Sequence, residues 1–370
     1  MTQPLGGSGT GPAGTAEPQL VRGVVLPYDE SRNLYVVAGR VSYEPVAAAR
    51  EVASGWIVPG LVDAHCHIGL GPDGAVDPAE QERQALAERA AGMLLARDAG
   101  AAADTRWIDD RDDLPRIIRA GRHLARTGRY LRNYGIELEP PDLPAAAVQQ
   151  AARGDGWVKI VADWIDRDRG DLTPCWPAEV LAEAVRRAQA AGARVTVHTF
   201  DEQGVADAIA AGVDCVEHGT GLTEQLIDSM AARGTALVPT LINVANFLAI
   251  AERASRYPAY ADHMRRMHAS APGRVAMAYE AGVPVFAGTD AGGAVAHGRV
   301  AEEVAALHAA GLPAEVALGA ASWAARRWLG RPDLAEGDPA DLVVYPTDPR
   351  KDLRVLAAPA RVILRGRIVL

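Results

Sequence analysis

The chain has few cysteines, and their arrangement suggests no structural role. Its 370 residues include only three, Cys66, Cys175 and Cys215, an odd number without the Cys-x-x-Cys spacing of a zinc or redox motif. We therefore expect neither a disulfide framework nor a metal held by cysteines. A reducing, cytoplasmic location fits this composition.

Long hydrophobic runs and an excess of positive charge are also missing. No segment reaches the ~18 consecutive apolar residues of a membrane-spanning helix, and residues 1–18 form a Gly/Pro/Thr-rich, flexible lead-in without the apolar stretch of a signal peptide. The formal net charge of −9 gives no attraction to nucleic acid or to an anionic membrane. We therefore expect neither as a partner. The expected partner is a small-molecule substrate, and the sequence is compatible with a homo-oligomer.

The middle of the chain alternates between short apolar runs and Ala/Leu/Glu/Arg-rich stretches, as parallel βα units do. This pattern predicts a TIM-type (β/α)8 barrel over residues 58–335. The helices include Pro177–Ala191, Asp201–Ala211 and Val300–Ala310, which precede the glycines Gly192, Gly212 and Gly311. The eight predicted strands are Gly60–Ala64, Gly92–Ala96, Arg116–Ala120, Trp157–Val161, Ala193–Val197, Val213–Val216, Ala236–Val238 and Pro284–Ala287.

The two ends of the chain have a different pattern, with short β-type runs separated by Gly, Pro and acidic residues. We predict that residues 19–57 and 336–370 together form a small β-sandwich domain, so that the complete α/β fold consists of a barrel and this sandwich. The predicted strands are Gln19–Val25, Leu34–Val41, Arg50–Ile57, Leu342–Tyr345 and a hairpin within Arg361–Leu370.

Histidines and one aspartate stand where several predicted barrel strands end. His65 and His67 are two residues apart, so in a strand both side chains point the same way. His198 and His218 end two successive strands, and Asp290 follows the last one. Alone, each residue is as readily structural as functional. Because strand ends meet at one rim of a barrel, together they predict a metal site.

Lys159 lies within an apolar strand, Trp-Val-Lys-Ile-Val, where an unpaired ammonium is costly to bury. A salt bridge to Asp163 or to another acid is the ordinary explanation. The alternative is that the buried amine reacts with carbon dioxide to form a carbamate, which is an anionic ligand able to bridge two divalent ions.

From about Val21 to its C-terminus the chain resembles the amidohydrolase superfamily, in its imidazolonepropionase-like and prolidase-like branch. The matching stretches are VPGLVDAHCH, LLARDAG, GRHLARTG, WVKI, VTVHT, GVDCVEHGTGL, GTDAGG, the following His297-Gly298, and GDPADLVV. The resemblance implies two divalent ions, most simply zinc: one on His65, His67 and Asp290, a second on His198 and His218, and a carboxylated Lys159 between them.

The same resemblance implies a zinc-dependent amidohydrolase. A metal-activated hydroxide would attack an amide, peptide or cyclic amide carbonyl of a small molecule, with Asp290 as proton shuttle. The family's Gly-Gly-His is replaced by Gly128-Arg129-Tyr130, so the specificity of relatives does not transfer directly. Candidate substrate contacts are Arg97, His123, Arg129, Tyr130 and His297, with Thr240 and Asn243 also near strand ends.

Two further functions are consistent with these residues. A mononuclear deaminase or a lactonase on the same barrel would not need a bridging carbamate at Lys159. A non-catalytic binding barrel is the third reading, although no expected ligand is missing. The segment from Ile242 to Pro272 is long for a connection and predicts an extra helix that covers the pocket; we assign no role to His263, His268 and His308.

Overall fold

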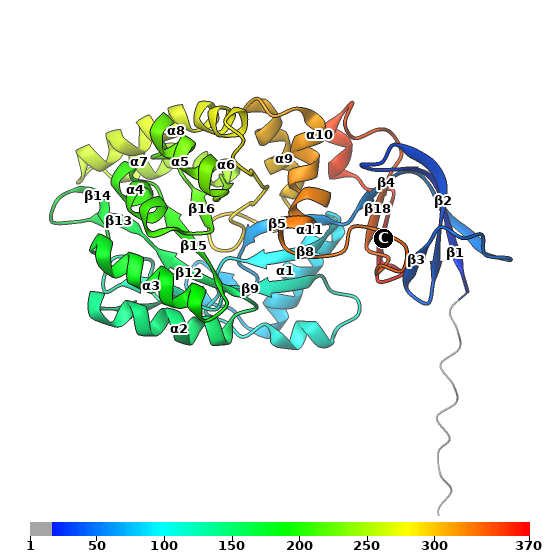
Figure 1. Ribbon diagram of the computed structural model, residues 1–370, viewed down its shortest axis with the longest axis horizontal. Helices are drawn as coiled ribbons and strands as arrows, with labels where there is room; N and C mark the ends of the chain where they lie inside the picture. The colour runs from blue at the N-terminus through cyan, green and yellow to red at the C-terminus, as the bar shows by residue number, and fades with distance from the viewer. Residues whose placement is uncertain (1–16) are drawn as a thin grey trace, which may run out of the picture.

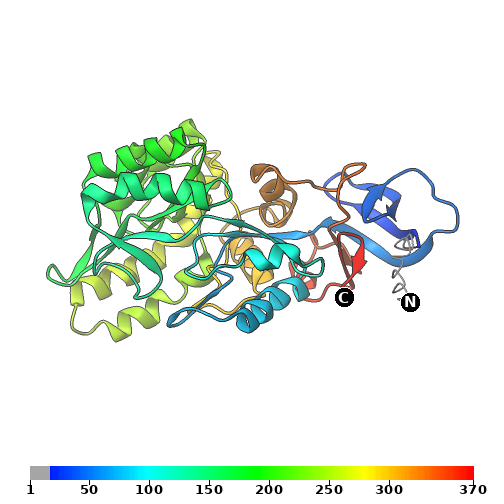
Figure 2. The ribbon, with the colours of Figure 1, turned by 90° about the horizontal axis from the view of Figure 1, so that it is seen from below.

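The computed structural model describes residues 17–370, so the predicted lead-in lies almost entirely outside the described residues. Figure 1 shows parallel strands surrounded by helices and, beside them, a β-sheet built from both ends of the chain. Figure 2 shows the same two parts from below. Among the described residues, no helix combines the length and hydropathy needed to cross a bilayer.

The sheet from the two chain ends has seven strands in the order β20-β19-β18-β4-β1-β2-β3. We expected a β-sandwich, but hydrogen bonds connect all seven strands into one sheet. Its core contains Val21, Val25, Ile57 and Leu342. The strands are β1 (Gln19–Val25), β2 (Glu30–Val37), β3 (Arg40–Ser42), β4 (Arg50–Pro59), β18 (Leu342–Tyr345), β19 (Arg361–Leu364) and β20 (Arg367–Ile368).

Two details of this sheet test the predicted strands. The hairpin within Arg361–Leu370 is confirmed, since β19 and β20 pair antiparallel across a turn at Arg365-Gly366. The single strand predicted over Leu34–Val41 is wrong, because a turn at Ala38 and Gly39 with positive φ angles of 49° and 80° separates β2 from β3.

The parallel strands follow the prediction closely. They form the orders β5-β8-β9 and β11-β10-β12-β15-β16-β17. Seven of the eight predicted strands are present, shifted by at most two residues, whereas β10 and β11 were not predicted. The strands are β5 (Leu61–Cys66), β8 (Met93–Asp98), β9 (Arg116–Arg119), β10 (His123–Arg126), β11 (Gly135–Leu138), β12 (Trp157–Val161), β15 (Arg194–Thr199), β16 (Cys215–His218) and β17 (Ala236–Val238).

The eighth prediction, Pro284–Ala287, is not a regular strand. Within it, Val285 forms an isolated parallel bridge to Leu237. On one side the backbone N–H of Leu237 donates to Pro284 O at 2.8 Å, and on the other Ala64 N–H donates to Ala287 O at 2.8 Å. The segment therefore lies between β17 and β5 and hydrogen-bonds to both, although its pairing is too irregular for a strand.

Helices cover the outer face of the parallel strands, and α2–α3, α3–α4, α4–α5 and α5–α8 pack as neighbours. The three helices named from the sequence are confirmed as α3, α4 and α9, and Gly212 with a φ of +81° ends α4. The helices are α1 (Pro78–Ala90), α2 (Leu143–Arg153), α3 (Ala178–Ala190), α4 (Glu202–Ala211), α5 (Glu224–Arg233), α6 (Leu241–Val244), α7 (Phe247–Arg253), α8 (Pro258–Glu280), α9 (Val300–Ala309), α10 (Ala314–Ala320) and α11 (Trp323–Trp328).

The connection after β17 contains the extra helical structure predicted for residues 242–272. It consists of α6, α7 and the first half of α8. Phe247 of α7 and Met264 and Met267 of α8 form a core cluster with Phe200. A hairpin of β13 (Asp163–Asp166) and β14 (Asp171–Pro174) was not predicted, nor was the two-residue pair β6 (Leu70–Gly71) and β7 (Gly74–Ala75).

Candidate metal centre

His65, His67 and Asp290 converge where β5 meets the segment after β17. Oδ1 of Asp290 lies 3.1 Å from Nε2 of His65 and 2.9 Å from Nε2 of His67. The two Nε2 atoms are 3.2 Å apart. Ligand atoms that each stand ~2.1 Å from a zinc ion are separated by roughly 3–3.5 Å, so the spacing of this trio suits a divalent ion.

A hydrogen bond on the far side of His67 decides which of its ring nitrogens is free. Nδ1 lies 2.7 Å from the backbone oxygen of Gly100, and because a carbonyl oxygen only accepts, Nδ1 must hold a proton. In the neutral ring, Nε2 then directs a lone pair at Asp290 Oδ1, which is also an acceptor. These two acceptors repel each other unless a proton or a cation lies between them. Metal-binding histidines are typically oriented by such a bond.

His198 and His218 form a second pair beside the first. Nδ1 of His198 and Nε2 of His218 are 2.9 Å apart, while Nδ1 of His218 lies 2.7 Å from the hydroxyl of Thr240. The ring centres of His218 and His65 are 5.2 Å apart, which joins the two groups into one cluster.

Burial determines the protonation of this cluster. It lowers the pKa of His65 to about 4 and that of His218 to about 3, and it holds the pKa of His198 well below its usual range. These rings are therefore neutral near pH 7, with lone pairs available to a cation.

Lys159, one of only two lysines in the chain, forms an ion pair with Glu217 beneath the histidines. Glu217 also accepts from Arg97 Nη2 at 3.2 Å and from Thr196 Oγ1 at 2.8 Å, and its Oε1 lies 3.5 Å from Nδ1 of His65. All these side chains are buried. Although burial opposes ionisation, His65, Lys159 and Arg97 hold the pKa of Glu217 well below its usual value.

The sequence suggested Asp163 or another acid as the salt-bridge partner of Lys159, and in the structure the partner is another acid, Glu217. The Oδ2 atom of Asp163 instead accepts from Thr199 Oγ1 at 2.5 Å and from the backbone N–H groups of Phe200 and Asp201. It thereby holds the turn that follows His198. Sequence reasoning overlooked Glu217, whose signal was an acid inside the apolar run Cys-Val-Glu-His.

A second buried aspartate, Asp63, anchors the other side of the site. Its carboxylate accepts from the backbone N–H groups of His65 at 3.0 Å and Thr289 at 3.1 Å, and from the Thr289 hydroxyl at 2.5 Å. These hydrogen bonds connect β5, which contains His65, to Thr289, the residue before Asp290. They thereby fix the position of His65 relative to Asp290.

Three residues of the site have left-handed backbone conformations that are unfavourable for non-glycine residues. The φ angles are +65° at His218, +48° at Thr240 and +58° at Asp290. Each such conformation costs on the order of 1–3 kcal/mol and persists only where surrounding contacts enforce it. Six other non-glycine residues with positive φ lie elsewhere in the described chain, so the strain supports a functional site only together with the contacts of these three residues.

Three of the predicted substrate contacts are already engaged elsewhere. Arg97 is completely buried and donates to Ala64 O and Glu217. Arg129 donates to backbone oxygens of Trp164, Ile165 and Thr173 and clamps the β13–β14 hairpin. Because of these contacts, neither arginine has a free two-point fork for a substrate carboxylate. His297 is also engaged, since its Nδ1 lies 2.8 Å from the carboxylate of Glu88.

The other two candidates do lie beside the histidines. His123 is buried, both of its ring nitrogens lack a hydrogen-bond partner, and its ring centre is 5.2 Å from that of His67. Tyr130 lies 5.3 Å from His123 and 5.8 Å from His198 between ring centres. Asn243, also named from the sequence, donates to Asp290 Oδ2 at 2.6 Å.

Two aromatic residues that the sequence did not single out, Trp164 and Phe200, also lie beside His198. Together with Tyr130 they form an aromatic wall of the site. Trp164 lies 4.8 Å from Tyr130 and 5.3 Å from His198, and Phe200 lies 4.4 Å from His198, all between ring centres. No role was assigned to His263, which lies away from this wall between the carboxylates of Asp171 and Glu202.

Comparison with known families adds to this geometry. The sequence matches the model of the amidohydrolase family over residues 56–369. The chain belongs to this family. Membership confirms the resemblance seen in the sequence motifs and supports a hydrolase activity for this amidohydrolase.

Sequence relatives include proteins of Mycobacterium tuberculosis and Mycobacterium bovis that are described as uncharacterised. Each is 58% identical over 349 residues, which is 94% of this chain and 94% of the relative.

Solved structures with the same fold include several hydrolases. A Xaa-Pro dipeptidase with bound methionine has a TM-score of 0.81 at 24% identity, over 95% of this chain and 99% of the other. A prolidase complexed with N-methylphosphonate-L-proline has a TM-score of 0.76 at 22% identity, with the same coverage. An A. niger ochratoxinase has a TM-score of 0.78 at 20% identity, over 96% of both chains.

Proposed function

We propose that this amidohydrolase is a metal-dependent hydrolase that cleaves a peptide, amide or cyclic amide bond of a small molecule. The observation that carries the proposal is the convergence of His65, His67 and Asp290 with mutual distances of 2.9–3.2 Å, beside the pair of His198 and His218. The proposal treats the parallel strands as a closed (β/α)8 barrel, which the hydrogen bonds of residues 284–291 to β17 and β5 support.

The donor set fits two divalent ions, and imidazole with carboxylate suits zinc. His65, His67 and Asp290 would hold one ion, and His198 and His218 the other. Bound ions would supply the positive charge that activates water and polarises the scissile carbonyl. Asp290 takes up the proton of the attacking water and returns it to the leaving nitrogen, and Asn243 orients its carboxylate by donating to Oδ2.

Lys159 is the residue that would bridge the two ions. Its neutral amine would add to carbon dioxide and release one proton, forming an N–C bond and an anionic carbamate. The ion pair with Glu217 favours the ammonium form, so this contact has to break before the carbamate forms.

The aromatic wall of Tyr130, Trp164 and Phe200 beside His198 favours a substrate with an apolar or cyclic group next to the scissile bond. Xaa-Pro dipeptides have such a group, and two structures of similar fold are described as a Xaa-Pro dipeptidase and a prolidase. N-acyl amino acids and cyclic amides such as imidazolonepropionate are the next substrates to test.

Metal analysis combined with a substrate panel tests the proposal. Purified protein should contain about two ions per chain, as a two-metal site requires, and should hydrolyse at least one Xaa-Pro dipeptide, N-acyl amino acid or cyclic amide. Lys159→Ala should lose at least one ion, and a carbamate should give a new ¹³C signal after incubation with ¹³C-bicarbonate. Absence of hydrolysis across the panel in metal-loaded protein would refute the proposed function.

A mononuclear deaminase or lactonase is the second candidate, and the contact of Lys159 with Glu217 favours it, because a lysine held in this way needs no carbamate. This alternative predicts one ion per chain, full metal occupancy in Lys159→Ala, and turnover of lactones or of aminated heterocycles with release of ammonia. Amide hydrolysis with two ions would exclude it.

A further inference from the structure

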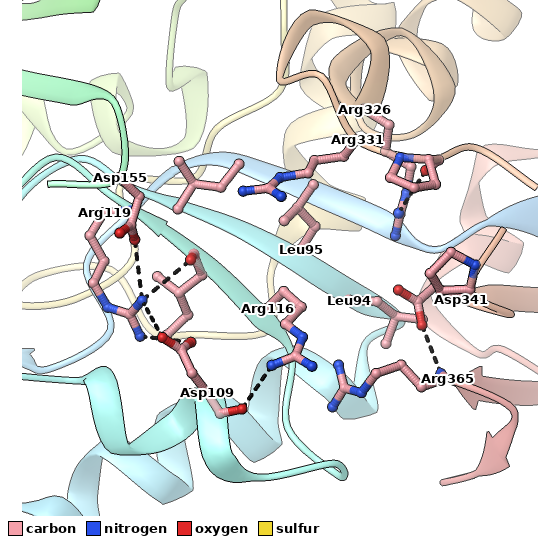
Figure 3. Close-up of a pocket in the computed structure, with 14 residues that line it drawn as sticks. Leu94, Leu95, Asp109, Arg116, Arg119, Asp155, Arg326, Arg331, Asp341 and Arg365 are labelled. Carbon is pink, nitrogen blue, oxygen red and sulfur yellow. Dashed lines mark hydrogen bonds and ion pairs between the residues drawn. The ribbon is translucent and has the colours of Figure 1, made fainter. Parts of the chain in front are cut away.

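A separate cavity of about 490 Å³ lies at the opposite ends of the strands from the histidine cluster. It is lined by residues near the starts of β8 and β9, by Asp155 before β12, and by the loops after α11 and before β18. The metal-centre histidines, in contrast, stand at or near the carboxyl ends of β5, β15 and β16. Figure 3 shows the cavity with its charged side chains.

Arginines dominate the polar lining of this cavity. Arg116, Arg119, Arg326, Arg331 and Arg365 line it, against three aspartates. Two of these aspartates, Asp109 and Asp155, pair with Arg119 at 3.0 and 3.2 Å. The remaining four arginines face one remaining lining aspartate, Asp341, so the pocket is positive in a chain whose net charge is −9.

Two guanidinium groups in this pocket have buried donors without acceptors. Arg326 is only 3% exposed; its Nε and Nη1 donate to the backbone oxygens of Gly60 and Pro332, whereas Nη2 has no partner. Arg365 donates through Nη2 to Arg111 O and Leu114 O, but its Nε and Nη1 have none. Buried donors are rarely left unsatisfied, so each needs an explanation.

Two of these cations also face each other. Figure 3 shows the guanidinium groups of Arg116 and Arg365 directed toward one another across the cavity. Burial and the charge of Arg116 both lower the pKa of Arg365. The nearby acids do not accept hydrogen bonds from Nε and Nη1 of Arg365. Asp341 accepts from the backbone N–H of Arg365 instead, and Asp112, which is 69% exposed, lies 4.0 Å from Nε.

We infer that this cavity binds a small organic anion that carries a phosphate or carboxylate group. The anionic group would pair with the exposed guanidinium groups of Arg116 and Arg331 and relieve the repulsion between Arg365 and Arg116, since guanidinium forks match such oxyanions. Leu94, Leu95 and Ile117, which also line the cavity, provide an apolar wall for the body of the ligand. This site is distinct from the proposed catalytic centre.

Calorimetric titration of the metal-loaded protein with phenyl phosphate, benzoate and benzyl alcohol at fixed ionic strength tests this inference. Arg116 and Arg331 are exposed, so the double variant Arg116→Gln/Arg331→Gln should keep its fold, as circular dichroism can verify. Arg266→Gln, which removes one charge from the exposed face of α8, is the control.

We expect the wild-type protein to bind phenyl phosphate or benzoate saturably and not to bind the neutral alcohol. The double variant should bind the anion at least tenfold more weakly, and Arg266→Gln should bind it as the wild type does. Either of two results would overturn the inference. One is that neither anion binds the wild-type protein. The other is that the double variant binds as tightly as the wild type, because the anion would then bind elsewhere, such as at the metal centre.

Discussion

Lys159 donates a hydrogen bond to Glu217 at the centre of the histidine cluster, and neither side chain reaches solvent. Glu217 simultaneously pairs with Arg97, so one carboxylate compensates two buried cations. Removal of one partner from a buried ion pair leaves an uncompensated charge, which is far more costly than loss of the whole pair.

Substitutions at these two positions should therefore have unequal effects on stability. Glu217→Gln leaves both Lys159 and Arg97 unpaired and should lower the free energy of unfolding by about 3–5 kcal/mol. Lys159→Met should cost less, because Glu217 keeps Arg97. The double variant, measured by denaturant unfolding, should lose less than the two single losses added together. Additive losses would contradict this account, because they would mean that the two residues do not interact.

Asp290→Asn should lower kcat by about 10²–10⁴-fold on any substrate found in the panel, because an amide cannot take up the proton. Metal content must be measured in the same samples, since Asp290 is also a proposed ligand. Asn243→Ala is the matched control: it removes the hydrogen bonds to Asp290 Oδ2 and from Asn246 Nδ2 but leaves the carboxylate, so it should have a smaller effect. Wild-type kcat in Asp290→Asn with full metal occupancy would rule out the shuttle.

Gly288→Ala should weaken both stability and metal binding. A Cβ atom at Gly288 would lie 2.4 Å from Val238 Cγ1 and 2.6 Å from His65 Cβ, so the added methyl group displaces a histidine of the candidate metal centre. Overpacking of this kind costs roughly 1–3 kcal/mol.

The matched control is Gly273→Ala within α8, where nothing lies within 4 Å of the added Cβ. This substitution should raise stability by about 0.5–1 kcal/mol, because alanine favours a helix. Thermal unfolding and metal titration of the two variants should give opposite shifts in melting temperature. Equal behaviour would show that the contact with His65 is unimportant.

Asp163 should make stability depend on pH. Burial raises the pKa of Asp163 to about 7 from an ordinary value of 3.8, and Oδ1 has no hydrogen-bond partner. Between about pH 4 and pH 7 the folded chain therefore retains a proton that the unfolded chain has lost, so stability falls as the pH rises through this window. The total loss is at most roughly 4 kcal/mol.

Asp163→Asn removes this titration while it keeps the shape of the side chain. The difference in unfolding free energy between the variant and the wild type should therefore shift in favour of the variant from pH 4 to pH 7 and stay constant above pH 7. A difference that does not change with pH would show that Asp163 is ionised in the folded protein throughout.

Local pattern was enough to predict most of the fold. Strands such as Trp157–Val161 and Ala236–Val238 agree exactly with the structure, because an apolar run between two helical stretches leaves few alternatives. The segment 284–287 was placed correctly but is not a regular strand, since it forms only an isolated bridge and a few hydrogen bonds to its two neighbours. The turn that splits β2 from β3 was missed because Ala38 adopts a conformation unusual for alanine.

The site was predicted less evenly. The five histidine and aspartate positions were singled out because each stands at or near the end of a predicted strand, and strand ends share one rim. Long side chains escaped prediction because their direction depends on partners far away in the chain. Arg97 and Arg129 were expected at a substrate, yet Arg97 turns to Glu217 and Arg129 to the β13–β14 hairpin.

The sequence by itself determined the family, the order of most strands and helices, and which short side chains stand at the strand ends, because these follow from local pattern and from recognisable motifs. Only the tertiary structure decided which charges compensate one another: that Lys159 pairs with Glu217 rather than Asp163, and that Arg326 and Arg365 keep unpaired donors beside a cavity. Charge pairing depends on distances of a few ångströms between residues up to hundreds of positions apart, and these distances exist only after the chain has folded.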